Sequence, residues 1–315
     1  MDYNKKRKFT LLIIAAVLIV VSLATFFIIK KITSKEYKLE KLGYSNEEIT
    51  VLLENKTYTF EEISNMEYNE NFVKLLNEKY FIKKNLSKYL EYIDMKPKVS
   101  ELDTVTLSDI VAIVNVGAHE KFYSNVKATD ISKDNLMLVN KYTNLDKEYA
   151  PDDIVKMNLQ YAFNNNSIRA DVYNAIKELI KDAKKEDLTI LANSSYRTYD
   201  SQEKVYNNYK ASRGEKGADL IAARPGHSEH QTGLALDLST LSSTSATFES
   251  TDEFSWLQEH AHEYGFILRY PKGKKYLTGF DYESWHYRYV GVDVATEIKE
   301  LGITFDEYYA YYLDK

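Results

Sequence analysis

A long apolar segment stands near the N-terminus, and the pattern of apolar and polar residues changes after it. Phe9–Ile29 contains 21 residues without a charge. As a helix at about 1.5 Å per residue it would span roughly 31 Å, the thickness of the hydrocarbon core of a bilayer. Residues 1–8 include four basic side chains, and Lys30, Lys31 and Lys35 follow the segment. By the positive-inside rule, this predicts a single-pass membrane protein with residues 1–8 in the cytoplasm and the rest outside.

A cleavable signal peptide also contains an apolar segment, but that segment usually has about 7–15 residues and ends at a small-x-small cleavage site. Here Lys30, Lys31 and Ile32 follow the apolar segment directly. The sequence therefore favours a transmembrane helix at 9–29 that stays attached to the chain over a signal that is removed.

The next part of the chain carries signals for short helices. Ser45–Glu48 and Thr59–Glu62 each match a capping box, in which Ser or Thr begins a helix and a glutamate three positions later bonds back to it. The apolar positions of Leu86–Ile93 have the spacing of an amphipathic helix, and Ile110–Val116 predicts another helix. No motif that carries chemistry occurs in these stretches. We therefore predict that residues 30–134 form a linker and a small helical spacer region.

Residues 135–315 alternate between strand-like and helix-like patterns, without a regular repetition of strand–helix–strand units. This favours an α+β domain with a mainly antiparallel sheet flanked by helices over a doubly wound parallel sheet. The predicted strands are 136–142, 188–192, 234–239, 266–270 and 282–290, and the predicted helices are one around 172–183 and one from Thr251 to Gly265.

Composition narrows the possible functions. The chain has 315 residues with 41 basic and 47 acidic side chains, for a formal net charge of −6. Nucleic acid is therefore an unexpected partner, because proteins that bind it concentrate Lys and Arg. The chain contains no cysteine, which excludes disulfides, thiol nucleophiles and thiolate zinc sites. A metal in this protein must be bound by histidines and carboxylates.

One carboxylate among apolar neighbours is the first candidate metal ligand. In Leu234–Ser239 the leucines alternate with small and polar residues, so a strand here would bury the leucines and point Asp237 to the opposite, half-buried face. A half-buried carboxylate requires a partner, because an unpaired buried charge is costly. His230 lies just before this strand, beyond a turn expected at Gly233. We expect His230 and Asp237 to meet at one zinc ion.

A catalytic zinc site needs three protein ligands and one open position. His286 is the candidate for the third ligand. Glu283 precedes it by three residues and can reach the same site if the chain turns between them, where it would act as a general base. His227 lies in the same loop as His230, and we expect it near the ligands without a bond to the metal.

These residues fall into a longer pattern with several fixed positions. SEHQTGLALD (228–237) is followed by ESWH (283–286), and together they match Ser-x-His-x-x-Gly-x-Ala-x-Asp and Glu-x-x-His, with Trp before the second His. The sequence therefore resembles the VanY type of zinc D-Ala-D-Ala carboxypeptidases. The resemblance extends upstream to SYRT (195–198) and Gln202, and covers roughly 135–301. It implies a hedgehog/DD-peptidase-like fold, a Zn²⁺ cofactor, and removal of the C-terminal D-Ala of peptidoglycan stem peptides outside the membrane.

The same resemblance implies a role for each candidate residue. Arg197 would stabilise the developing oxyanion or the substrate carboxylate, because its guanidinium presents a rigid fork of donors. One departure concerns Ser195, where relatives commonly have glycine, and it affects the expected shape of that turn. The implied zinc ligands are His230, Asp237 and His286, the implied catalytic base is Glu283, and the implied substrate contacts are Gln202 and Ser228.

Alternatives from other classes also follow from the sequence. Ser124–Lys127 and Ser201–Lys204 match the S-x-x-K motif of serine peptidases, but the Lys-Thr-Gly and Ser-Asp-Asn elements that accompany it are absent from the sequence. A module that only binds peptidoglycan would keep the metal ligands but would not need Glu283. Within the enzyme class, L,D-carboxypeptidases acting on tetrapeptide stems share the same motifs, so the sequence leaves D,D and L,D specificity open.

Overall fold

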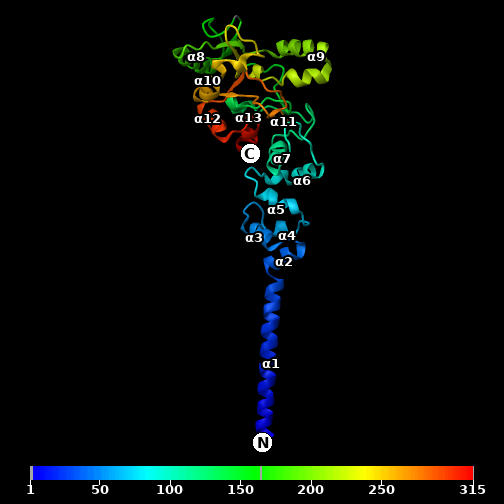
Figure 1. Cartoon of the computed structure of the whole chain (residues 1–315). Helices are drawn as coiled ribbons and strands as arrows, with labels where there is room; N and C mark the ends of the chain where they lie inside the picture. Colours follow the sequence, from blue (N-terminus) through cyan, green and yellow to red (C-terminus); the bar gives the residue numbers. More distant parts are fainter. Residues whose placement is uncertain (1–2, 164, 315) are drawn as a thin grey trace. The chain divides into compact units, whose positions relative to one another are not determined.

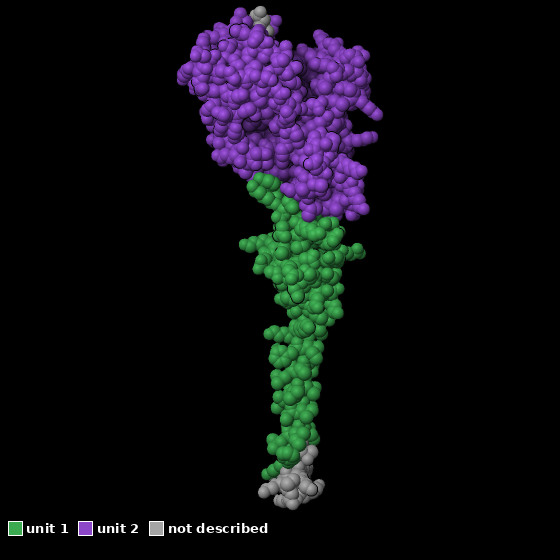
Figure 2. All heavy atoms as spheres, in the orientation of Figure 1, with its two compact units in different colours: residues 1–86 green, residues 87–315 purple. Residues whose placement is uncertain are grey.

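The computed structural model describes the whole chain except residues 1–2, 164 and 315. The start of the predicted cytoplasmic segment and the last residue of the predicted C-terminal domain therefore lie outside the described residues. The chain divides into two compact units, Met1–Leu86 and Ser87–Lys315, which are coloured separately in Figure 2.

The first unit begins with one long apolar helix, α1 (Tyr3–Ile32) (Figure 1). Its section Leu11–Ile32 has 22 residues and a mean hydropathy of 3.1 in its most apolar window, and nothing in the structure buries that window. By length and composition this helix can cross a membrane, although a signal sequence has the same properties. The predicted apolar segment 9–29 is confirmed as a helix, and its role as a permanent anchor stays a prediction.

Short helices follow α1 in the first unit, and their apolar faces share one buried core. Both predicted capping boxes are confirmed. The carboxylate of Glu48 accepts from the N–H of Ser45 at 2.8 Å, and that of Glu62 accepts from the N–H of Thr59 at 2.8 Å. The elements are α2 (Lys35–Leu42), α3 (Asn46–Glu54), α4 (Phe60–Ser64), α5 (Glu70–Leu76) and the short 3-10 helix η1 (Lys83–Asn85).

The second unit contains a four-stranded sheet in the order β5-β6-β8-β7, in which each neighbouring pair is antiparallel. The pairing of β6 with β8 places Asp237 opposite His286. The predicted combination of helices with an antiparallel sheet is present in this unit. The strands are β5 (Leu191–Ser194), β6 (Ala235–Ser239), β7 (Phe266–Leu268) and β8 (His286–Tyr289).

Helices surround this sheet, with α8, α10 and α12 on one side of the second unit in Figure 1 and α9 projecting on the other. Gly214 (φ 70°) bends α9 into two arms. The helices are α6 (Leu86–Asp94), α7 (Leu107–Asn115), α8 (Ala170–Lys185), α9 (Tyr199–Ile221), α10 (Asp252–His260), α11 (Lys275–Thr278), α12 (Val292–Leu301), α13 (Phe305–Tyr308) and the π-helical turn η6 (Tyr309–Leu313).

Shorter elements complete the second unit. β1 (Lys127–Ala128) pairs in parallel with β2 (Thr143–Asn144), and β3 (Ile154–Lys156) pairs antiparallel with β4 (Ser167–Arg169). The 3-10 helices are η2 (Ile131–Leu136), η3 (Glu229–Thr232), η4 (Phe248–Ser250) and η5 (Ala261–Tyr264).

The main core of this unit lies between α8 and the sheet. The apolar side of α8 and the leucines at 234, 236 and 238 belong to one buried cluster, as the alternation in the sequence predicted. Because the leucines face α8, the side chain of Asp237 points to the other face of β6, where 17% of its surface remains exposed. The packing of the core therefore determines which side of the sheet carries the carboxylate.

The predicted strand at 136–142 is wrong. The side-chain oxygen of Asn140 accepts hydrogen bonds from the N–H groups of Tyr142, at 2.8 Å, and Thr143, at 3.0 Å, which closes a turn in the middle of the segment. The apolar residues are buried nonetheless, Val139 completely. A turn whose apolar side chains are buried therefore has the same run of apolar residues that is typical of a strand.

The predicted strand at 282–290 is shorter in the structure, where β8 begins only at His286. The residues before it form a turn, because the N–H of His286 donates to the carbonyl oxygen of Glu283 at 3.3 Å. The condition stated for Glu283, a turn between it and His286, is therefore met.

The compact units separate at residue 86, whereas the predicted spacer region extends to residue 134. Ala112 and Ile113 of α7 are buried together with Leu277 of α11, so α7 packs with the C-terminal part of the chain. The functional division of the chain at 134 stays a prediction.

Candidate metal and peptidase site

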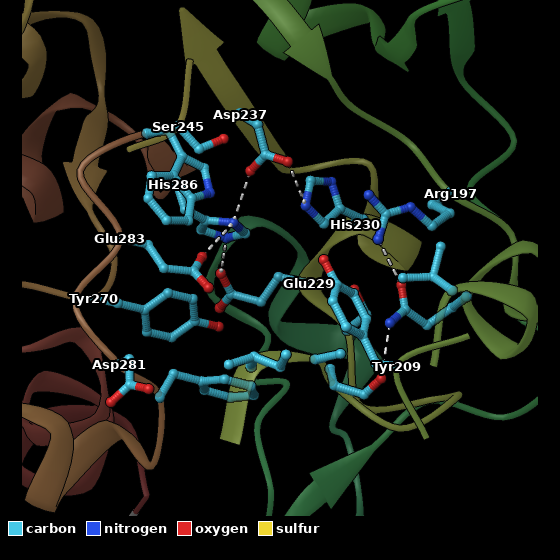
Figure 3. Close-up of a pocket in the computed structure, with 18 of the residues that line it drawn as sticks. Arg197, Tyr209, Glu229, His230, Asp237, Ser245, Tyr270, Asp281, Glu283 and His286 are labelled. Atoms are coloured by element: carbon cyan, nitrogen blue, oxygen red, sulfur yellow. Dashed lines mark hydrogen bonds and ion pairs between the residues drawn. The ribbon is translucent and has the colours of Figure 1, made fainter. Parts of the chain in front are cut away.

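One cavity of about 470 Å³ lies in the second unit, beside β6, the start of β8, η3 and α9 (Figure 3). The lining of this cavity includes all seven residues that were proposed for the site from the sequence. They are Arg197, Gln202, Ser228, His230, Asp237, Glu283 and His286.

His230 is held by the backbone of the segment after β5. Its Nδ1 lies 2.7 Å from the carbonyl oxygen of Ser195, and its own carbonyl accepts from the N–H of Arg197 at 3.1 Å. Because a carbonyl only accepts, Nδ1 carries the proton and Nε2 keeps a free lone pair. That Nε2 lies 3.5 Å from Oδ2 of Asp237. The backbone thus selects the tautomer whose Nε2 is free to bind a metal.

The hydrogen bonds of the Ser195 side chain explain why this turn tolerates a serine in place of glycine. Its side chain is buried, accepts from the N–H of Ser167 at 3.0 Å and donates to the side-chain oxygen of Asn166 at 2.8 Å. These bonds tie the turn to β4 and fix the direction of the Ser195 carbonyl. The hydroxyl therefore supports the turn whose shape the sequence left open.

Gly233 is required at the end of η3. Its φ of 67° is left-handed, and a Cβ there would lie 2.8 Å from Cδ1 of Ile154 and 2.9 Å from Cγ of Arg169. A side chain would therefore be strained and would also collide with its neighbours. This turn carries the chain directly from His230 into β6 and Asp237.

Asp237 and His286 meet across the β6–β8 pair. Nδ1 of His286 lies 3.1 Å from Oδ1 of Asp237, and the two histidine rings stand nearly perpendicular, with centroids 5.1 Å apart. Burial alone would raise the pKa of Asp237, but His230 and His286 outweigh it and hold that pKa far below its ordinary value. The carboxylate is therefore ionised between two ring nitrogens.

These three side chains suit a divalent cation. Each offers one donor atom within 4.8 Å of the others, and two nitrogens with one oxygen form a donor set that zinc commonly takes. Two ligands about 2.1 Å from one tetrahedral ion lie roughly 3.4 Å apart, and here Nε2 of His230 lies 3.5 Å from Oδ2 of Asp237 while Nδ1 of His286 lies 3.1 Å from Oδ1. Burial lowers the pKa of His286, but hydrogen bonds to Asp237 and Glu229 raise it to about 10, so a metal bound at Nδ1 would have to displace a proton from that nitrogen. The residues present therefore fit zinc.

Glu283 faces the same cluster from the turn before β8. Its Oε2 lies 3.7 Å from Nδ1 of His286, and Figure 3 shows its carboxylate beside that ring. Burial raises the pKa of Glu283 to about 7, with His286 opposing the shift and Asp237 adding to it. A carboxylate with such a pKa can accept and return a proton near neutral pH.

Arg197 approaches the cluster from the other side. Its Nη1 donates to the side-chain oxygen of Gln202 at 2.7 Å, and its Nη2 donates to the hydroxyl of Ser194 at 2.9 Å. The Gln202 nitrogen in turn donates to the carbonyl of Ala223 at 2.7 Å. Both side-chain partners of the guanidinium are neutral, so its charge is available to an anion in the cavity. Gln202 holds Arg197 in place, while its predicted contact with substrate stays a prediction.

Sequence reasoning missed Glu229, which lies between Ser228 and His230 at a variable position of the motif. It is 1% exposed, and its Oε2 lies 3.4 Å from Nε2 of His286. Burial would raise its pKa, but Arg269 and Arg288 hold the pKa well below its ordinary range. These arginines lie 40 and 59 residues further along the chain, so no local pattern signals them.

His227 lies outside the three-donor cluster. Its Nδ1 is 2.8 Å from the carbonyl oxygen of Asn140, and its ring packs edge-to-face against Tyr123 at 4.9 Å between centroids. It thus shares the loop of His230 but is not one of the three donors of that cluster. Ser228 lines the cavity and is buried, and its contact with substrate also stays a prediction.

Comparisons with known proteins agree on one family. The family model VanY, described as D-alanyl-D-alanine carboxypeptidase, matches residues 165–292. The protein YodJ of Bacillus subtilis (strain 168) is 40% identical over 181 residues, which are 55% of this chain and 66% of YodJ. The D-alanyl-D-alanine carboxypeptidase of Enterococcus faecalis (strain ATCC 700802 / V583) is 30% identical over 227 residues, which are 67% of this chain and 81% of that protein.

Among solved structures, that of the LD-carboxypeptidase LdcB is similar to this chain, with a TM-score of 0.56 and 37% sequence identity. The match covers 61% of this chain and 92% of LdcB. The chain spans slightly less than two thirds of the length of YodJ. All seven candidate residues fall within the matched range 165–292.

Proposed function

Because this chain belongs to the VanY family of D-alanyl-D-alanine carboxypeptidases, we propose that it hydrolyses the C-terminal D-alanine from peptidoglycan stem peptides. In this proposal zinc is bound by His230, Asp237 and His286. One observation carries the proposal: the three donors share a single cavity with the carboxylate of Glu283 and the guanidinium of Arg197.

The side chains then divide the reaction among them. When bound, zinc acts as a Lewis acid toward the scissile carbonyl and lowers the pKa of a coordinated water to about 7. Glu283 accepts a proton from the attacking water and returns it to the nitrogen of the departing D-alanine. Its pKa of about 7 suits both transfers, since burial weakens the acid without making it a strong base.

Arg197 is the group that makes the site an exopeptidase site in this proposal. A C-terminal D-alanine carries a carboxylate, and the fork of Arg197 matches a carboxylate with two parallel hydrogen bonds. Its neutral partners, Gln202 and Ser194, hold the fork without neutralising it. Binding of the terminal carboxylate would place the last peptide bond near Glu283.

Arg197→Lys should therefore lower kcat/KM by about 10²-fold, because an ammonium is a single point charge and cannot make the bidentate contact. The kinetics are measured on the full chain in detergent, with a pentapeptide stem and with the same peptide ending in a C-terminal amide. If Arg197 binds the carboxylate, the variant and the wild type should differ much less on the amide. An equal defect on both peptides would instead assign Arg197 to the oxyanion.

Release of free D-alanine tests the proposed function directly. The full chain in detergent is loaded with zinc and incubated with a pentapeptide stem ending in D-Ala-D-Ala, beside a sample treated with a chelator. We expect release from the zinc-loaded sample, and a decrease of at least roughly 10³-fold on metal removal, because several kcal/mol of transition-state stabilisation depend on the metal. Activity should return on addition of zinc.

A second candidate function is favoured by the similarity to the LD-carboxypeptidase LdcB, at 37% identity over 61% of this chain. A tetrapeptide stem ending in a single D-alanine, tested in parallel, separates the two. Release only from the tetrapeptide would identify an L,D-enzyme. Release from neither peptide, by a sample that binds zinc, would instead indicate a module that binds peptidoglycan without hydrolysing it.

We propose further that α1 anchors the site to the outer face of the cytoplasmic membrane. A 22-residue section of α1 that is long and apolar enough to cross a membrane supports an anchor, and a peptidoglycan substrate requires the second unit to be outside the cell. Protease added to intact cells should digest the second unit while it leaves cytoplasmic proteins intact. A second unit found in the culture medium after cleavage beyond Ile32 would contradict the anchor.

A further inference from the structure

Glu229 has no place in the proposed catalytic steps, yet it is fully enclosed beside them. Its Oε1 accepts from Nε of Arg269 at 2.7 Å and from Nη1 of Arg288 at 2.9 Å. The side chains of all three residues are 0% exposed. Both arginines bond to the same carboxylate oxygen, so the other oxygen is left for a different partner.

That partner is the ring of His286. Oε2 of Glu229 lies 3.4 Å from Nε2 of His286, and Oδ1 of Asp237 lies 3.1 Å from Nδ1 on the opposite side of the ring. Figure 3 shows the ring between these two carboxylates. An ionised carboxylate can only accept a hydrogen bond, so the proton of a neutral His286 belongs on Nε2, facing Glu229.

We propose that Glu229 is a positioning residue for the metal site: it keeps the Nε2–H tautomer of His286 and so presents Nδ1 as a metal donor. The inference rests on the proposed function, since it assigns His286 to the metal. A histidine ligand whose other nitrogen donates to a carboxylate is fixed in orientation and is a stronger donor. The carbonyl oxygen of Ser195 has the same role for His230. It accepts a hydrogen bond from Nδ1 and leaves Nε2 for the metal, whereas Glu229 accepts from Nε2 of His286 and leaves Nδ1.

The surroundings hold Glu229 in one place. Arg288 also donates from Nη2 to the carbonyl oxygens of Asn135, at 3.0 Å, and Met137, at 2.8 Å. Arg269 also donates from Nη1 to Asp306 of α13. The carboxylate is therefore supported by β8, by the end of β7 and by the C-terminal helices. A buried group with this many fixed partners has little freedom to turn away from His286.

The testing variant is Glu229→Gln, made in the full chain and purified in detergent. Its amide oxygen can still accept from Arg269 and Arg288, and its NH₂ group would then face Nε2 of His286. A donor at this position favours the opposite tautomer, with the proton on Nδ1, where the metal would bind. We therefore expect the Kd for zinc, measured by competition with a chromophoric chelator, to rise by about 10–100-fold.

Asp306→Asn is the matched control. It removes a buried negative charge from the same network, because Asp306 accepts from Arg269 and from the Asn140 side chain. Among the described residues, Asp306 makes no hydrogen bond or ion pair with His286. The control should therefore lower the unfolding temperature and leave the zinc Kd within about threefold, whereas a tautomer effect moves the Kd. Visible absorption of the cobalt-loaded proteins gives a second readout, which should change shape only for Glu229→Gln.

The outcomes are distinguishable. Wild-type zinc affinity and an unchanged cobalt spectrum in folded Glu229→Gln would overturn the inference, and so would an equal loss of affinity in Asp306→Asn. If Glu229→Gln does not fold, Glu229→Asp replaces it. This variant keeps the charge for the arginines but withdraws the oxygen from His286, and it must still weaken zinc binding. A wild-type protein that binds no zinc would refute the proposed function itself, whatever Glu229 does.

Discussion

His230→Ala should remove both zinc binding and D-alanine release. The alanine leaves Asp237 and His286 as the only two donors of the cluster, and a catalytic zinc needs three protein ligands. Metal analysis of the dialysed protein should fall from about one zinc per chain to nearly none, and kcat/KM should decrease by at least roughly 10³-fold. Both quantities are measured on the same preparation.

His227→Ala is the control for this variant. It removes another buried imidazole from the same loop, where His227 bonds to the carbonyl of Asn140 at 2.8 Å. The control should keep its zinc and most of its activity. A His230→Ala protein that retains one tightly bound zinc would show that the metal is bound elsewhere, and the proposed ligand set would be wrong.

Glu283→Gln should keep zinc and lose almost all turnover. Glutamine has nearly the same size and can still accept a hydrogen bond, but its amide cannot take up a proton. Loss of a general base typically costs about 10²–10⁴-fold in rate, and we expect the decrease in kcat rather than in KM. Stopped-time D-alanine release on the zinc-loaded full chain measures it, with the zinc content determined in parallel.

The zinc content matters because Oε2 of Glu283 lies only 3.7 Å from Nδ1 of His286. Loss of zinc in Glu283→Gln would make Glu283 a ligand instead of a base. Asp281→Asn is the control, since Asp281 lines the same cavity, is paired with Lys275 at 2.6 Å, and lies apart from the metal donors in Figure 3. Normal turnover in Glu283→Gln would eliminate the assigned base.

Several features of the protein could be read from short stretches of sequence. The apolar segment 9–29 predicted α1, and the capping boxes at Ser45 and Thr59 predicted the starts of α3 and α4. Each depends on residues within one or a few turns of each other, so the local pattern contains all the information needed. The alternation in 234–239 likewise identified the buried side of β6.

The candidate site was also largely accessible from the sequence, because fixed spacings connect its members. Gly233 provides the turn from His230 to Asp237, and a short turn connects Glu283 to His286. The same local reasoning failed at 136–142, where apolar residues are buried around the turn made by Asn140. A pattern of burial does not distinguish a strand from a buried loop.

What the sequence determined by itself is thus the set of short-range elements and the residue types at the site. Only the tertiary structure decided that Asp237 faces His286 across two strands and that Arg269 and Arg288 enclose Glu229. The physical reason is that contacts between residues 40 to 59 positions apart depend on strand order and register. Strand order and register are fixed by the packing of the sheet against α8 and the rest of the second unit, and no local periodicity of the sequence indicates them.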